Sequence, residues 1–172
     1  SPTTTVASSS QINLSWTKWN GKNVMVVRST SASFTAPTQG TAYSVGNTIG
    51  SGTVVYNGSG TSFNDTGLNP GTTYYYAFYS ENYSYYSTNS SANATTYTEY
   101  RSKTTGNWNS TSTWEKNTNG SWIDATATPT SSDWTITIRN GHTVTVTASV
   151  TVDQVTVQSG GTVVLSARTL TI

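Results

Sequence analysis

The chain has 172 residues, of which 33% are hydrophobic and only 9% are charged, with eight basic and seven acidic side chains. A net charge of +1 offers no basic surface for nucleic acid or anionic lipid, and the absence of cysteine excludes disulfides, thiol nucleophiles and cysteine-bound zinc. No apolar run reaches the ~18 residues needed for a membrane span, and Ser1–Ser10 lacks a signal-peptide pattern, so we expect a mature product or a fragment.

The residue types favour a β-rich protein that works outside the cell. Ser and Thr hydroxyls replace the missing charges as solvating groups, and 11 Tyr and 6 Trp argue against disorder. We therefore expect a secreted protein, extracellular or at the cell surface, of a bacterial type. Apolar and polar residues alternate with period two, as in Gln11–Trp16 and Trp134–Ile138, and helical periodicity is missing. The sequence predicts an all-β protein.

Residues 1–98 carry positions typical of one sandwich family. Trp16 ends the alternating run that contains Ile12 and Leu14, and a Leu-x-Pro-x-Thr-x-Tyr pattern occupies residues 68–74. In these residues the segment resembles a fibronectin type III domain, in which a core Trp lies on the second strand and the Tyr hydroxyl ties a turn to the β-sandwich. The fold hosts many functions, so the resemblance implies no activity.

The same resemblance implies where further strands lie. It places the third strand at Lys22–Arg28 and the seventh at Ser91–Tyr97. The long stretch between Arg28 and Thr53 departs from the family and is similar to the enlarged connection of some secreted bacterial modules. An aromatic strand, Tyr74–Tyr79, follows the turn pattern. We expect one of its faces to fill the core and the other, with Tyr75 and Tyr79, to cover the sheet surface.

A loop rich in tyrosine follows the aromatic strand. Its rings, Tyr83, Tyr85 and Tyr86, are candidate contact residues that stack on glycan rings or pack against a neighbour; simple loop packing is the alternative. Eight of the fifteen Asn residues stand in Asn-x-Ser/Thr acceptors, a slight excess over composition, so glycosylation remains an open expectation.

The composition changes near Tyr97–Thr105, from Tyr-rich to Val/Thr-rich, which favours two modules at 1–98 and 99–172. The second contains an internal repeat, since Ile136–Ala148 aligns with Val155–Ala167 at an offset of 19. A period of about 20 residues with three short β-prone runs is typical of a β-solenoid, and we predict a β-solenoid or β-helix module of about two coils. The stretch is similar to the beginning of parallel β-helices in large secreted bacterial proteins.

Stacked coils place equivalent side chains above one another. The alignment predicts that Ile136 lies over Val155, Val144 over Val163 and Val146 over Leu165. We expect three tryptophans to cap the first coil: Trp108, Trp114 and Trp122.

The second coil has no comparable cap. Its end, Thr169–Ile172, is uncharged and β-prone, and exposed strand edges recruit further strands. The predicted assembly residues are Val163, Leu165, Leu170 and Ile172 on the accepting coil, with Thr5 and Val6 on a donor strand within Ser1–Ser10.

The sequence contains no catalytic constellation that we identify. The acidic residues form no calcium loop, and a glycosidase pair made by two of them that converge in space is a remote alternative. The single histidine, His142, aligns with the turn residue Gly161. We expect His142 to be a solvent-facing turn residue, and we predict no enzyme activity, no cofactor and no metal.

Two functions remain. The first is a non-catalytic structural or adhesive protein that self-associates end to end into a filament by β-strand addition or coil stacking. The second is an accessory spacer or carbohydrate-binding region of a larger secreted enzyme or adhesin, in which further domains of the same polypeptide supply the missing coils. Neither predicts a nucleic-acid partner or a membrane span.

Overall fold

The computed structural model describes residues 1–18 and 21–172. Their regular elements are strands, apart from one 3-10 turn at Thr111–Thr113, which confirms an all-β protein. Among these residues no helix is long and apolar enough to cross a membrane. The chain divides into two compact units, one formed by Ser1–Leu68 with Thr72–Thr96 and the other by Asn69–Gly71 with Tyr97–Ile172.

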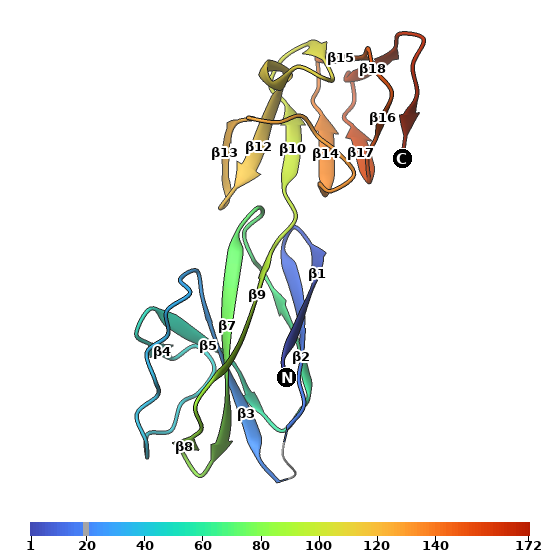
Figure 1. Ribbon diagram of the computed structural model, residues 1–172. Coiled ribbons are helices and arrows are strands. Elements are labelled where there is room, and N and C mark those ends of the chain that lie inside the picture. The colour runs from blue at the N-terminus through green and yellow to red at the C-terminus, as the bar shows by residue number, and fades with distance from the viewer. Residues whose placement is uncertain (19–20) are drawn as a thin grey trace. The chain divides into compact units, whose positions relative to one another are not determined.

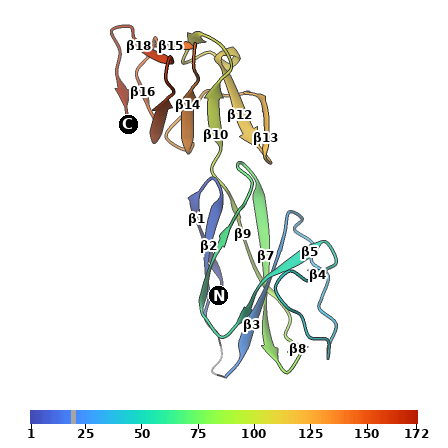
Figure 2. The same ribbon diagram turned by 180° about the vertical axis from the view of Figure 1, so that it is seen from behind.

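The first unit is a β-sandwich of two antiparallel sheets (Figure 1). The smaller sheet has the order β1-β2-β6, formed by β1 (Thr3–Ser8), β2 (Gln11–Ser15) and β6 (Ser62–Thr66). The larger has the order β4-β5-β3-β7-β8, formed by β4 (Thr48–Ile49), β5 (Gly52–Gly58), β3 (Asn23–Ser29), β7 (Thr73–Asn82) and β8 (Tyr85–Tyr86). A further strand, β9 (Ser90–Thr95), pairs with β7, so β7 runs between β3 and β9 (Figures 1 and 2).

The alternating pattern of the sequence sets the core between these sheets. In β2 the side chains of Ile12 and Leu14 are buried and their neighbours are not, and Trp16 continues the buried face. From the opposite sheet Tyr76 and Phe78 meet them. Apolar alternation at period two thus produced a sheet with one face on the core, as predicted.

The larger sheet is buried on its other face as well. A second cluster contains Met25, Val27, Tyr79 and Tyr86, with Phe34 packed against it from the long stretch that follows β3. Tyr79 lies on this other face of the sheet, as expected, and is itself buried because residues of the long connection pack against the same cluster. Two-sided burial explains the consecutive apolar residues at 24–27.

A charged group links the two sheets. Asp65 on β6 is 3% exposed, and its carboxylate accepts hydrogen bonds from Arg28 at 2.7 Å and from the Tyr76 hydroxyl at 2.9 Å. Burial, together with the Asp65 carboxylate, raises the pKa of Tyr76 far above its usual range. Hydrogen bonds to both oxygens offset the cost of burying this carboxylate, and loss of either partner would leave part of that desolvation cost uncompensated.

The second unit contains three small sheets with parallel pairing (Figure 1). One has the order β13-β12-β10-β14-β17, formed by β13 (Ser121–Asp124), β12 (Trp114–Thr118), β10 (Glu99–Ser102), β14 (Thr135–Ile138) and β17 (Gln154–Val157). The second has the order β11-β15-β18, formed by β11 (Gly106–Asn107), β15 (Thr143–Val146) and β18 (Thr162–Leu165). The third pairs β16 (Val150–Thr151) with β19 (Leu170–Thr171). We call β10 and β11 the base layer, β14–β16 the inner layer and β17–β19 the end layer.

The pairing between inner and end layers follows the sequence repeat. Ile136 pairs with Val155, Val144 with Val163 and Val146 with Leu165, all in parallel register, as the offset of 19 predicts. Gly141 and Gly160 hold equivalent turns, with φ of 76° and 80° in the left-handed region that glycine adopts readily. The Gly141 amide donates to the Gly160 carbonyl at 3.0 Å, so the turns stack as well.

The base layer closes one end of this core. Trp108, which follows β11, and Trp114, which begins β12, are buried in the same cluster as Tyr100 of β10. Their rings are 4.9 Å apart, and the Trp114 indole donates to the Trp108 carbonyl at 2.8 Å. Trp122 does not belong to this closure, contrary to expectation. Its ring is only half-buried and lies 4.3 Å from the guanidinium of Arg101, because β13 is the outer strand of its sheet.

Candidate functional site

The end layer presents apolar side chains to solvent. Ile138 and Val146 of the inner layer are 0% exposed, whereas their paired residues Val157 and Leu165 are 46% and 53% exposed. Both β17 and β18 lie at the edges of their sheets, and an edge strand has main-chain groups free for pairing. The end layer therefore combines an unpaired edge with uncovered core positions.

The four predicted residues of this surface differ in exposure. Val163 and Leu170 are partly buried against the core of the unit, whereas Leu165 and Ile172 are open, the latter 69% exposed. Val157 belongs with the open residues and was missing from the predicted set. Its signal was present in the repeat, since the alignment sets it opposite Ile138.

The predicted donor strand is already used within the chain. Val6 pairs with Ile12 and Thr5 with Asn13 in the antiparallel β1–β2 ladder. The Thr4 hydroxyl also donates to the Asn93 carbonyl at 2.9 Å. β1 is nevertheless the edge strand of its sheet and pairs on one side only, so association of Thr5 and Val6 through the other side of β1 stays a prediction.

The three loop tyrosines separate into two kinds. Tyr83 is 89% exposed and Tyr85 is 65% exposed, so both rings are accessible. Tyr86 is buried in the second cluster, with Met25 and Tyr79, and its hydroxyl donates to the Thr41 carbonyl at 2.9 Å. Burial raises the pKa of the Tyr86 hydroxyl, and the nearby Glu81 carboxylate adds to the shift. Tyr86 thus packs within the fold and holds the hairpin in place, which is the alternative given for this residue, and only Tyr83 and Tyr85 offer open rings.

His142 lies in the turn that the repeat predicts, but it has a structural partner. Its Nδ1 is 2.8 Å from the Ser102 hydroxyl, which also accepts a hydrogen bond from the Arg139 amide at 2.9 Å. Ser102 is 0% exposed. A serine nucleophile must reach its substrate, so the pair fits a buried support for the turn better than a catalytic dyad.

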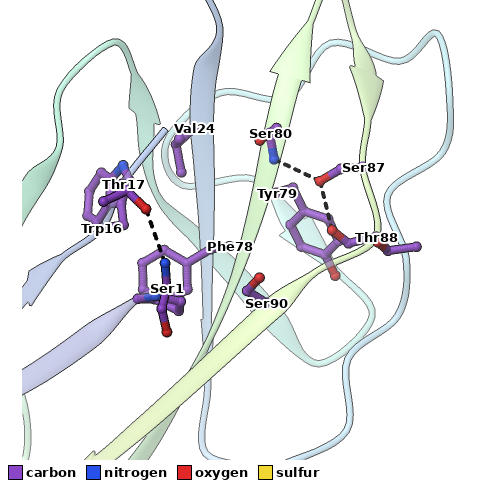
Figure 3. Close-up of a pocket in the computed structure, with 11 residues that line it drawn as sticks. Ser1, Trp16, Thr17, Val24, Phe78, Tyr79, Ser80, Ser87, Thr88 and Ser90 are labelled. Carbon is purple, nitrogen blue, oxygen red and sulfur yellow. Dashed lines mark hydrogen bonds between the residues drawn. The ribbon is translucent and has the colours of Figure 1, made fainter. Parts of the chain in front are cut away.

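The pockets of the β-sandwich differ in size. Figure 3 shows one of about 80 Å³, whose lining includes Trp16 and Phe78 and, across from them, Ser87. That volume holds a few water molecules, far below the ~300 Å³ at which small-molecule sites begin. A second, open cavity of about 310 Å³ lies beside Tyr83. Within residues 1–18 and 21–172, no group of three or more acidic or histidine side chains could hold a metal ion.

Comparison with known proteins identifies no family. No family model matches the chain, and no curated protein matches it. Among solved structures, a computationally redesigned β-sandwich protein is similar, with 20% identity, a TM-score of 0.40 and coverage of 55% of this chain and 84% of that one. A fibronectin type III domain of the human fibronectin type III domain containing protein 3 is similar too, with 17% identity, a TM-score of 0.38 and coverage of 55% and 80%. Both likenesses cover about half of this chain and are likenesses of fold alone, and the β-sandwich itself rests on the strand order of the first unit.

Proposed function

We propose that this chain is a non-catalytic, extracellular structural or adhesive module that associates end to end through its end layer. One observation carries the proposal: Val157 and Leu165 repeat the positions of Ile138 and Val146, yet about half of each side chain is exposed. Covering these side chains with a further layer would remove apolar surface from water, at roughly 25 cal/mol per Å². The low charge and high hydroxyl content support a location outside the cell.

The second unit fits the beginning of a β-solenoid. Its sheets gain one parallel strand with each layer, and equivalent residues pair in register from the inner to the end layer. In such stacks each layer buries the apolar side of its neighbour, and terminal layers need a cap. Trp108 and Trp114 supply that cap on the base layer. The described residues place no equivalent aromatic cover on Leu165.

Association at this surface would be driven by main-chain pairing and apolar burial. Arg168 is the one charged residue between Gln154 and Ile172, and its guanidinium donates to the Thr147 carbonyl at 3.2 Å. A strand added to β17 or β18 would therefore meet few charges. Main-chain hydrogen bonds supply affinity in this mode, and alternate side chains fix the register.

The occupant that we propose is a second copy of this chain. Two end layers that meet face to face bury Val157 and Leu165 of both copies, and such a contact closes at a dimer. Contact between an end layer and a different surface leaves an end layer free and continues into a filament. The sedimentation experiment below separates these two outcomes by particle size.

A longer polypeptide is the alternative. There the next layer follows in the same chain, and the present residues form an accessory spacer of a larger secreted enzyme or adhesin. A natural sequence that continues past Ile172 with the same period of about 20 residues would favour this alternative.

The test compares two lysine variants by sedimentation velocity over a range of protein concentrations. Leu165→Lys places a charge under the added layer and should abolish association. Val164→Lys is the matched control, because Val164 lies on the same strand, is 41% exposed and points to the opposite face. The proposal predicts association of the unaltered chain and of Val164→Lys. Leu165→Lys should stay monomeric, with the thermal midpoint that the unaltered chain has in dilute, monomeric solution. A monodisperse monomer for all three chains at the highest concentration would refute it.

A further inference from the structure

The hairpin of β7 and β8 ends in an unusual turn. Asn82 pairs with Tyr85, which leaves Tyr83 and Ser84 as a two-residue connection with φ of 49° and 64°. Two successive positive φ angles define a turn that usually contains Asn-Gly, because other residues are disfavoured there. Tyr83 lowers the stability of the fold in two ways at this position: its backbone adopts a disfavoured conformation, and its ring, 89% exposed, leaves apolar surface in water.

The structure around the turn holds it in this conformation. The Ser84 amide donates to the Glu81 carboxylate at 2.8 Å, and the Gly40 amide donates to the Ser84 carbonyl at 2.8 Å. Gln39 bonds to both main-chain groups of Tyr86, at 3.0 and 2.8 Å. The long connection after β3 thus clamps the hairpin, so Tyr83 is presented on a fixed support.

The surface beside Tyr83 is polar and open. The cavity of about 310 Å³ is lined by Gly21, Asn23, Glu81, Asn82 and Tyr83. The two amides and the carboxylate offer both donors and acceptors, and this lining contains no cation to hold a phosphate or sulfate. Two accessible rings with amides around them are too small an apolar surface for a stable protein interface, which covers ~800 Å² on each partner.

From these observations we propose that the tip of the β7–β8 hairpin binds a neutral carbohydrate. A sugar ring stacks its apolar face on Tyr83, and its hydroxyls bond to Asn23, Asn82 and the free lone pairs of Glu81. Tyr85, 65% exposed and two residues away, offers a second ring to a longer glycan. Tyrosine suits this role because it supplies a large amphipathic contact with few rotatable bonds. This inference does not depend on the association proposed above.

Tyr83→Asn separates a binding role from a structural one. Asparagine adopts positive φ more readily than tyrosine, so the variant should keep or raise the thermal midpoint while it removes the ring. Tyr75→Ala is the control, since Tyr75 lies on the same β7 strand, is partly exposed and is remote in sequence from the turn. A third variant, Tyr83→Trp, retains a stacking surface.

The probes are a neutral glucan, a mannan and a xylan, each embedded in a native gel for affinity electrophoresis, together with an array of neutral oligosaccharides. We expect retardation of the unaltered chain, Tyr75→Ala and Tyr83→Trp on at least one probe, insensitive to salt. Tyr83→Asn should weaken that binding by about tenfold or more, with no loss of thermal midpoint. Absence of binding to every probe, or equal binding by Tyr83→Asn, would overturn the proposal.

Discussion

Two runs of consecutive apolar residues in this chain differ in how far their side chains are buried. In the β-sandwich, Val24–Val27 are at most 4% exposed, because the strand has the main core on one face and the long connection on the other. In the second unit, Val163–Leu165 form a similar run at a sheet edge, yet Val164 is 41% and Leu165 53% exposed. A run of consecutive apolar residues therefore predicts a strand whose two faces are both buried in the native assembly. In this chain only the run in the first unit is buried on both faces by residues of its own unit.

The largest effect should come from the closed end of the second unit. Trp114→Ala removes a ring that is 0% exposed and packed on Trp108, so it should lower the free energy of unfolding by about 3–5 kcal/mol. Trp122→Ala is the matched control, and loses only its half-buried contact with Arg101, about 0.5–1 kcal/mol. Urea titrations of both variants measure the difference. Equal losses would show that Trp114 does not close the stack.

A second pair of substitutions compares the two apolar runs directly. Met25→Ala removes a 0% exposed side chain and should cost about 2–5 kcal/mol of unfolding free energy. Leu165→Ala, measured at a protein concentration where the chain is monomeric, should cost about 0.5 kcal/mol or less. If Leu165→Ala were as costly as Met25→Ala under those conditions, Leu165 would already be covered within the single chain.

A third prediction concerns the link between the sheets of the β-sandwich. The raised pKa of Tyr76 means that the unfolded chain loses this proton above about pH 10 while the folded chain keeps it. The contribution of Tyr76 is therefore fully present below pH 10 and declines as pH rises, by about 1.4 kcal/mol per pH unit. Tyr76→Phe should lower stability at neutral pH because it loses the bond to Asp65. Above about pH 10 the unfolding free energy of the variant should fall less steeply with pH than that of the unaltered chain, by about 1.4 kcal/mol per pH unit. Urea titrations from about pH 9 to about pH 11 provide the measurement, and an unchanged slope would refute the assignment.

The parts of the fold that were predictable from the sequence are those that repeat or alternate. The burial of Ile12 and Leu14 follows period two, and the pairing of Ile136 with Val155 follows the offset of 19. A third strand at Asn23–Ser29 and a late strand at Ser90–Thr95 lie close to the positions that the fibronectin resemblance implied. Such signals are local or periodic, so the residues themselves reveal them.

What the sequence concealed depends on contacts between distant residues. Phe34 lies in a stretch without periodicity, and nothing local indicates that this stretch covers Tyr79. The bonds of Asp65 to Arg28 and Tyr76 join residues far apart in the sequence. The base layer was missed because Tyr100 and Gly106, which pair with Ile136 and Val144, share no residue type with them. Equally, the burial of Tyr86 and the pairing of Val6 with Ile12 of β2 depend on contacts that no local pattern reveals.

The most direct test of an open end layer is amide hydrogen exchange at increasing protein concentration. Amides of β15 lie between two neighbouring strands and should be protected at every concentration. The amides of β17 and β18 that point away from β14 and β15 should exchange quickly in dilute solution and become protected as the chains associate, and Leu165→Lys should prevent this protection. Exchange of these outward-pointing β18 amides that is slow in the dilute monomer, or that does not respond to concentration, would contradict an exposed layer that takes up a further one.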